Sequence, residues 1–133
     1  MRGGTANCGV VLSDEEIGSP LVLRPDCLVV MNEPSFRRFE PMVAEGGKLI
    51  ADSSLVTGRS KRLDVTEFRV DATRLAQENH LCGLANIIML GRLIRETGIL
   101  SVSVVQKALS ACIPAAKTAL LTGNLAALEL GCR

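Results

Sequence analysis

Short runs of consecutive aliphatic residues, separated by polar turns, mark the first half of the chain. The clearest run covers residues 26–31 (Asp-Cys-Leu-Val-Val-Met) and follows Pro25. Apolar side chains point to both sides of such a run, which is typical of a strand buried on both faces in a parallel sheet. Similar runs at residues 48–51 and 67–70 predict two more strands, and residues 6–12 predict one near the start of the chain.

A helical pattern that begins at Pro34 separates the first two aliphatic runs and places Phe36 and Phe39 on one face. Pro41 falls inside this pattern and is expected to kink or shorten the helix, because proline removes a backbone hydrogen bond. Residues 25–53 therefore predict one β-α-β unit, with parallel strands and a right-handed crossover.

The rest of the chain reads as helical. Helices are predicted at residues 72–78, 84–97, 102–111 and 114–130. Gly98 and Gly131 are expected to end the second and the fourth, since glycine accepts the left-handed conformation that closes a helix. Gly123 marks a weak point inside the last helix, where a break is conceivable. The prediction is an α/β protein: a single domain over residues 1–133, with a Rossmann-like, doubly wound, mostly parallel sheet and a helical C-terminal third.

Composition changes this picture in one respect. Hydrophobic residues make up 47% of the chain and charged residues only 22%, so the surface is expected to be less charged than that of a lone domain. The surplus apolar surface predicts a partner subunit. The net charge of +1 gives no electrostatic case for nucleic acid. The most apolar stretch, residues 81–94, is too short to span a bilayer, and no secretory signal is seen, so we expect a cytoplasmic protein without membrane contact.

Candidate metal ligands and nucleophiles are sparse. The five cysteines are widely spaced, no Cys-x-x-Cys pair occurs, and His80 is the only histidine. We therefore expect reduced, mostly buried thiols, and neither a zinc site nor an iron–sulfur cluster held by this chain. No Gly-x-Gly-x-x-Gly or P-loop pattern is present either. No catalytic residue is predicted, and His80 is placed in a connecting loop.

Polar residues follow both strands of the β-α-β unit: Asn32 after the first, Ser53 and Ser54 after the second. The carboxyl ends of parallel strands lie at one edge of the sheet, outside which ligands bind in open α/β folds. The helix that begins after Asn32 would add free N–H groups for an anion or a carbonyl. Helix capping and a turn explain the same residue types without any ligand, so both interpretations stay open.

A second group of candidates stands at the start of the chain: Arg2, Gly3, Gly4, Thr5 and Asn7. The glycines permit close backbone approach to a ligand, and the guanidinium offers a bidentate fork for phosphate or carboxylate. The alternative interpretation is a frayed terminus.

Asn86 is the last candidate, because it lies within the apolar helix predicted at 84–97. A buried amide needs hydrogen-bond partners, and a bond in the core or at an interface is expected there rather than a ligand contact.

Five segments, in order and spacing, resemble one family. They are Arg-Gly-Gly-Thr-Ala-Asn-Cys at 2–8, Gly-Ser-Pro at 18–20, Asn-Glu-Pro-Ser at 32–35, residues 46–54, and Ala-Asn-Ile-Ile-Met-Leu-Gly at 85–91. Together they look like the gamma subunit, or gamma domain, of 2-oxoacid:ferredoxin oxidoreductases, over practically the whole chain. The first segment is more like the 2-oxoglutarate and branched-chain members than the pyruvate members.

The resemblance implies a share in a larger enzyme. The family's holoenzyme decarboxylates a 2-oxoacid on thiamine pyrophosphate, passes electrons through iron–sulfur clusters to ferredoxin and releases an acyl-coenzyme A. The implied partners are the alpha and beta subunits, with or without a delta subunit, and ferredoxin only indirectly. The cofactors would belong to the holoenzyme and none to this chain alone. Arg2 and Asn32 would act as polar anchors at the subunit junction or the coenzyme A channel, in a chain that is inactive by itself.

One departure from the family affects these expectations. Members normally begin earlier, with a strand, a Gly-x-Gly-Gly-Gln-Gly loop and a helix, whereas this chain starts directly on the Arg-Gly-Gly segment. The chain is thus expected to be a fragment, a sequence with a mis-called start or a reduced variant, with an unpaired sheet edge. Two rival functions remain: a non-catalytic assembly or regulatory module, and a free-standing small-molecule binder that uses the Asn32/Ser53 edge.

Overall fold

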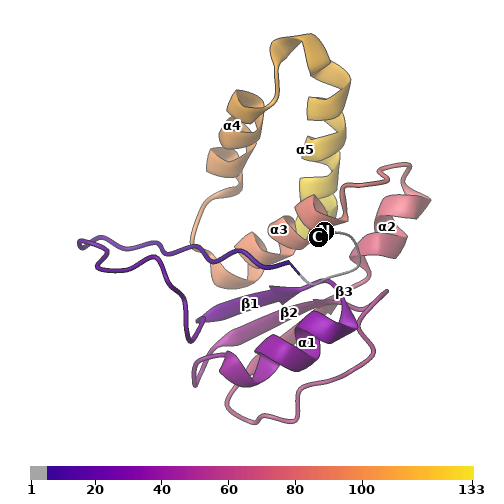
Figure 1. Cartoon of the computed structure of the whole chain (residues 1–133). Coiled ribbons are helices and arrows are strands. Elements are labelled where there is room, and N and C mark those ends of the chain that lie inside the picture. Colours follow the sequence, from indigo (N-terminus) through magenta and orange to yellow (C-terminus); the bar gives the residue numbers. More distant parts are fainter. Residues whose placement is uncertain (1–5) are drawn as a thin grey trace.

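The sheet has three parallel strands in the order β1-β2-β3, as seen in a computed structural model that describes residues 6–133 (Figure 1). In chain order the elements are β1 (Cys27–Val30), α1 (Glu33–Phe39), the 3₁₀ turn η1 (Glu40–Met42), β2 (Lys48–Asp52), β3 (Thr66–Val70), α2 (Ala72–Glu78), α3 (Ala85–Thr97), α4 (Val102–Cys112), the 3₁₀ turn η2 (Ala115–Lys117) and α5 (Thr118–Cys132). The predicted α/β class is confirmed.

Helices cover both faces of the sheet, as expected for a doubly wound fold. On one face, α1 packs Phe36 against Val30 and Leu49. On the other, Ile50 of β2 packs against Ile88 and helices α2, α3 and α5 (Figure 1). β2 is buried along nearly its whole length, because aliphatic side chains leave it in both directions and each meets a helix.

The predicted β-α-β unit is confirmed, with β1 and β2 parallel and Val30 opposite Ala51. Pro41 has the expected effect: α1 ends at Phe39 and the chain tightens into η1, which contains the proline. Gly98 closes α3 at φ 64°, and its N–H donates to the carbonyl of Ile94 at 2.8 Å. This left-handed residue is the predicted helix end.

Gly131 does not end α5, so that prediction is wrong. It lies inside the helix where α5 crosses α3, opposite the carbonyl of Ile88. A Cβ atom on Gly131 would overlap that carbonyl and come 3.0 Å from the amide nitrogen of Arg92, and one on Gly91 would come 3.0 Å from the Cα of Gly131. The two glycines therefore let the helix backbones touch. Gly123 causes no break, since α5 runs through it.

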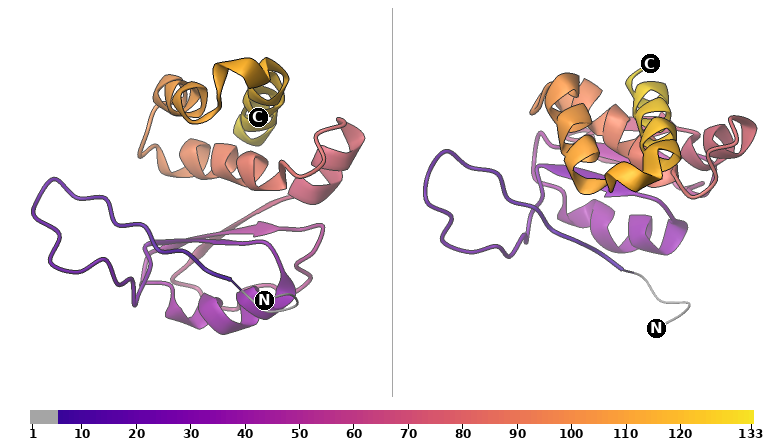
Figure 2. Two further views of the ribbon diagram at one scale, coloured as in Figure 1. Left: turned by 45° about the horizontal axis from the view of Figure 1, so that its top comes forward. Right: turned by 90° about the horizontal axis from the view of Figure 1, so that it is seen from above.

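The strand predicted at residues 6–12 is not formed. Residues 6–24 make an arm without helix or strand, which runs out from the body and returns to it in both views (Figure 2). No residue of this described arm takes part in a backbone–backbone hydrogen bond. Val10 and Leu12 stay 74% and 65% exposed. A strand needs a neighbour to satisfy its N–H and C=O groups, and the arm has none.

The thiols are free but not mostly buried, contrary to expectation. Cys8, Cys82 and Cys112 are exposed, and Cys27 and Cys132 are half-buried. Exposed loop and helix-end positions account for the first three, where no core is available to cover them.

No single helix among the described residues has the length and apolar character to cross a membrane. Only α4 and α5 taken together, with η2 between them and a bend of 112°, reach that length and composition.

Candidate functional site

The carboxyl ends of the three strands form the edge where sequence placed the first candidate residues. Asn32 follows β1 and is the N-cap of α1, since its Oδ1 accepts a hydrogen bond from the N–H of Ser35 at 2.9 Å. Its carbonyl accepts from the N–H of Phe36 at 3.1 Å. The capping interpretation of Asn32 is confirmed. Asn32 is exposed.

Glu33 is a residue of this edge that sequence reasoning missed. Its Oε2 accepts hydrogen bonds from the backbone N–H groups of Thr57 (2.8 Å) and Gly58 (3.1 Å). These two donors, Gly58 first, hold the pKa of the Glu33 carboxyl below its ordinary value. A Cβ atom on Gly58 would lie 2.9 Å from the ring of Phe36. Glu33 thus fixes the loop after β2 against α1. Its two partners follow it in the sequence by 24 and 25 positions.

Asp52, at the end of β2, is a fully buried carboxylate. It accepts hydrogen bonds from the N–H of Ser54 at 3.0 Å, the N–H of Thr73 at 3.3 Å and the hydroxyl of Thr73 at 2.6 Å. A buried carboxylate is tolerated when such donors replace its water. Asp52 therefore ties the turn after β2 to the first turn of α2.

Ser53 and Ser54 extend the same joint. The hydroxyl of Ser53 donates to Asp71 Oδ1 at 2.5 Å, and the Ser54 hydroxyl oxygen accepts from the N–H of Arg74 at 3.1 Å. Arg74 in turn pairs with Asp71 at 2.5 Å. α2 is thus held at its start by side chains from the turn after β2. The side chain of its own N-cap residue, Asp71, makes no capping hydrogen bond. The interpretation of these serines as turn residues is confirmed.

Asn32 and Ser53 stand opposite each other when the β1–β2 register is continued by two residues. Each is nevertheless tied to its own neighbours: Asn32 to α1, and Ser53 to the segment between β3 and α2. The edge therefore contains two hydrogen-bonded joints, one on each side of β2, and its polar groups mainly hold protein to protein.

Asn86 was expected to form a hydrogen bond in the core or at an interface; the core position is wrong, and the interface contact stays a prediction. It is the second residue of α3, is exposed, and its Oδ1 accepts from the N–H of Ile87 at 2.9 Å. The apolar face of α3 is made by Ile88, Met89 and Ile94. With 3.6 residues per turn, the position of Asn86 in the helix does not fall on that face.

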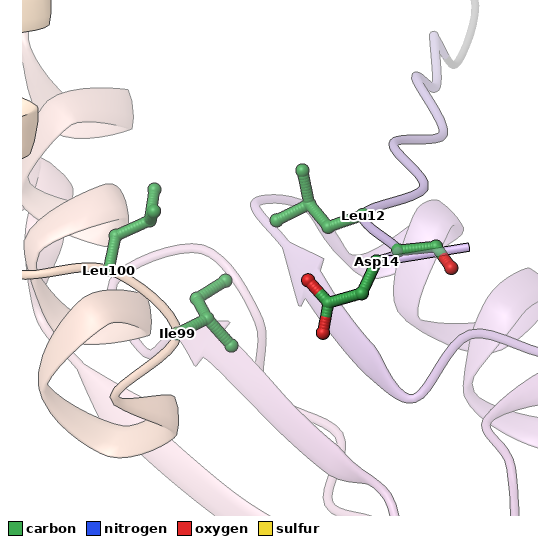
Figure 3. A pocket seen from close by; sticks show the side chains of 5 residues that line it. Leu12, Asp14, Ile99 and Leu100 are labelled. Carbon is green, nitrogen blue, oxygen red and sulfur yellow. The ribbon is translucent and has the colours of Figure 1, made fainter. Parts of the chain in front are cut away.

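Asn7 is exposed and lines a cavity of about 1280 Å³ along the outer side of β1. The arm bounds this cavity on one side, and α3 with the loop after it on the other. Leu12 and Asp14 of the arm lie across a smaller hollow from Ile99 and Leu100 (Figure 3). Arg2, Gly3, Gly4 and Thr5 lie outside the described residues.

Metal-ligating side chains do not gather in the part of the chain that the structure describes. No group of three His, Cys, Asp or Glu side chains there could hold a metal ion. His80 is exposed in the turn after α2, in the left-handed region at φ 58°, which agrees with the loop position predicted for it.

Comparison with known proteins gives a consistent result. Residues 1–133 match the family described as pyruvate ferredoxin/flavodoxin oxidoreductase. The 2-oxoglutarate synthase subunit KorC of Methanocaldococcus jannaschii is 38% identical over 115 residues, which is 85% of this chain and 62% of that protein. The ketoisovalerate oxidoreductase subunit VorA of Methanothermobacter thermautotrophicus is 42% identical over 90 residues, 68% of this chain and 18% of that protein.

Solved structures share the fold. The gamma subunit of a keto/oxoacid ferredoxin oxidoreductase from Geobacter sulfurreducens superposes with a TM-score of 0.72 at 25% identity, over 80% of this chain and 61% of that one. Pyruvate oxidoreductase subunit PORC from Thermotoga maritima gives 0.64 at 26% identity, over 83% and 63%. The chain thus spans less than two thirds of the length of these relatives.

Proposed function

The chain belongs to the pyruvate ferredoxin/flavodoxin oxidoreductase family, and we propose that it is the gamma component of a 2-oxoacid:ferredoxin oxidoreductase. The observation that carries this is the match over residues 1–133, joined to a fold shared with the Geobacter gamma subunit. The names of the relatives, 2-oxoglutarate synthase and ketoisovalerate oxidoreductase, favour 2-oxoglutarate or a branched-chain 2-oxoacid over pyruvate as the substrate of the complex.

In the proposed complex, oxidative decarboxylation of the 2-oxoacid yields an acyl-coenzyme A. Thiamine pyrophosphate and the iron–sulfur clusters would supply the carbanion and electron-transfer chemistry in the alpha, beta and any delta subunit. This chain offers no fitting site for a cluster within residues 6–133, because no three metal-ligating side chains converge there. In this proposal the chain contributes a scaffold whose sheet edge is fixed by the Glu33 and Asp52 joints.

The surface of the chain supports a subunit role. Among residues 6–133, thirteen large hydrophobic side chains are substantially exposed. They are Val10, Leu12, Ile17, Leu21, Leu23, Met42, Leu55, Leu63, Ile99, Leu100, Val102, Val104 and Leu120. Their clustering on the arm and around the start of α4 is typical of surface that partners cover. Arg2, Asn7 and Asn32 remain the polar candidates for anchors at a subunit junction or a coenzyme A channel.

Co-expression with the candidate alpha and beta subunits tests this proposal. The purified complex should reduce a viologen dye only when both a 2-oxoacid and coenzyme A are present, and 2-oxoglutarate or a branched-chain acid should be preferred. The isolated chain should show no such activity. A complex that assembles through this chain, yet turns over equally well after the chain is removed, would instead support a non-catalytic assembly role. Failure to co-purify at all would refute both.

A further inference from the structure

The connection between β2 and β3 is long and irregular. Residues 53–65 join these adjacent parallel strands without a helix, although a parallel crossover of this length usually contains one. The connection lies on the side of the sheet that α1 covers (Figure 1), and Val56 is buried there in the same cluster as Phe36. Long loops without secondary structure are usually either disordered or functional. The contacts that the loop makes distinguish the two cases.

Carboxylates from three elements accept hydrogen bonds from the middle of this loop. Glu33 of α1 accepts from the N–H of Gly58 at 3.1 Å. Glu40 of η1 accepts from the hydroxyl of Ser60 at 2.5 Å, and Glu67 of β3 accepts from the N–H of Ser60 at 3.3 Å. These carboxylates therefore fix the loop between α1 and β3.

Two arginines complete these contacts. Arg69 of β3 donates to the carbonyl of Gly58 at 2.8 Å. Arg62, inside the loop, donates to the carbonyl of Val43 at 2.6 Å and pairs with Asp64 at 2.6 Å. Hydrogen bonds that involve a charged group are stronger than neutral ones, so the loop is ordered by its side-chain contacts rather than by regular secondary structure.

Side chains alternate in direction along residues 58–63, as they do in an extended segment. The even-numbered residues of this stretch are half-buried and make the contacts just described. The odd-numbered residues are exposed: Arg59, Lys61 and Leu63. Among residues 6–133, neither Arg59 nor Lys61 forms an ion pair.

The acidic side chains that hold the loop do not compensate these two cations. Those of Glu33, Glu40 and Glu67 accept hydrogen bonds from N–H and hydroxyl groups of the loop. That of Asp64 pairs with Arg62. The exposed face of the loop thus carries a local excess of positive charge beside a fully exposed leucine. Because the loop is already ordered, a partner that binds it loses little conformational entropy.

We propose that this outward row, Arg59, Lys61 and Leu63, docks the chain onto an acidic surface of a partner subunit that has an apolar notch for Leu63. The inference rests on the proposed function, which supplies the partner subunit. Opposite charges around the contact would speed association and set its orientation, and burial of the leucine would hold the complex together. The row lies apart from the cavity beside β1, because no residue of 53–65 lines that cavity.

The make-up of the outward row disfavours other anionic partners. Membrane-binding clusters contain about four to eight basic residues, and nucleic-acid sites have a strongly basic face, whereas this row has two cations in a chain of net charge +1. A few matched charges around an apolar contact are instead the usual make-up of an interface between proteins.

Association kinetics test the docking site, with the whole chain and the purified alpha and beta subunits, measured by biolayer interferometry from about 50 to 300 mM salt. R59E/K61E should lower the association rate constant by at least about tenfold at low salt and reduce its dependence on salt. L63S should raise the dissociation rate constant and leave the salt dependence of association unchanged. All three side chains are exposed, so these variants should keep the wild-type circular dichroism spectrum.

K107E/K117E is the matched control, because it reverses the same number of charges at exposed positions of α4 and η2. It should associate as the wild type does. At subunit concentrations that saturate binding, the R59E/K61E complex should turn over the 2-oxoacid at the wild-type rate, with the wild-type KM for coenzyme A.

The docking site is overturned, with the subunit role intact, if R59E/K61E associates as fast as wild type or if K107E/K117E slows association equally. A raised KM for coenzyme A in R59E/K61E would also overturn it, by assigning the cations to the phosphates of the coenzyme. Binding to phosphatidylglycerol vesicles or duplex DNA that R59E/K61E abolishes, with subunit association unchanged, would assign the row to a membrane or to nucleic acid instead. If the wild-type chain does not associate with the subunits at all, the proposed function fails together with the docking site.

Discussion

Replacing Gly131 with alanine should destabilise the fold, although alanine is the better helix former. In an unconstrained helix interior, the change from glycine to alanine is worth about 0.5–1 kcal/mol in favour of alanine. At Gly131 the new Cβ would overlap the carbonyl of Ile88 and lie 3.0 Å from the amide nitrogen of Arg92. Both obstacles are backbone atoms of α3 and cannot rotate away, so α3 and α5 must separate.

Overpacking of this kind costs about 1–3 kcal/mol, and contact with a rigid backbone belongs at the upper end of that range. After subtraction of the propensity gain, G131A should lower the free energy of unfolding by about 2 kcal/mol. For a chain of this size, that corresponds to a fall in Tm of about 6–10 °C. Circular dichroism would give the free energy of unfolding from a urea titration and the Tm from a thermal scan, for wild type and variant.

Gly123 in the same helix provides the matched control. A Cβ there would meet only side-chain atoms of Leu84 and Leu81, at 3.4 and 3.7 Å, which are ordinary contacts. G123A should therefore stabilise the protein by about 0.5–1 kcal/mol. If G131A were as stable as wild type, or if the two variants shifted in the same direction by the same amount, the close crossing of α3 and α5 would be refuted.

Three further expectations concern the sheet edge. The pKa of Glu33 is held down in the folded state, so the contribution of Glu33 to stability is present above the ordinary carboxyl pKa and is lost as pH falls through the lower folded value. The urea midpoint should therefore depend less on pH in E33Q than in wild type between about pH 3 and 6. Equal slopes for the two proteins would contradict this. D52N should lower the free energy of unfolding by about 2–4 kcal/mol, because an amide nitrogen would then face the donors of Ser54 and Thr73; a neutral effect in urea titration would argue against the buried joint. N32A should cost about 1 kcal/mol while N32D costs little, and in the assembled complex a loss of 2-oxoacid turnover in N32D as well as N32A would show that the amide does more than cap α1.

Local signals predicted the parts of the fold that local chemistry decides. The aliphatic runs of β1 and β2, the proline that shortens α1 and the glycine that closes α3 each act within a few residues, and all were placed correctly. The strand expected at residues 6–12 failed because a strand exists only with a neighbour, and a pattern of side chains does not reveal whether one is present. Gly131 was misjudged for a related reason: a glycine that closes a helix and one that admits another helix look the same in sequence.

The candidate site also divides into residues with local roles, which the sequence predicted, and residues with distant partners, which it did not. Asn32 and Ser54 were recognised as residues that cap or turn, and the structure assigns them those roles. Glu33 and Asp52 escaped notice, because their partners stand 24 and 21 residues further along the chain and no spacing rule links them. Asn86 was assigned to a buried face since its helix is apolar, yet it lies in the first turn, before that face begins.

These hydrogen bonds bear on which surface of the chain is available for recognition. At this sheet edge the Glu33 and Asp52 carboxyl groups accept hydrogen bonds from backbone N–H groups, and the Ser53 hydroxyl donates to Asp71, so much of the polar surface is already engaged within the protein. Apolar surface, by contrast, is abundant. Residues 102–132, which include α4 and α5, carry only three charged side chains, Lys107, Lys117 and Glu129, and within residues 6–133 β1 pairs with β2 alone. Burying such surface gains roughly 25 cal/mol for each square ångström of apolar area. This apolar surface supports the proposed role as a subunit of a larger complex.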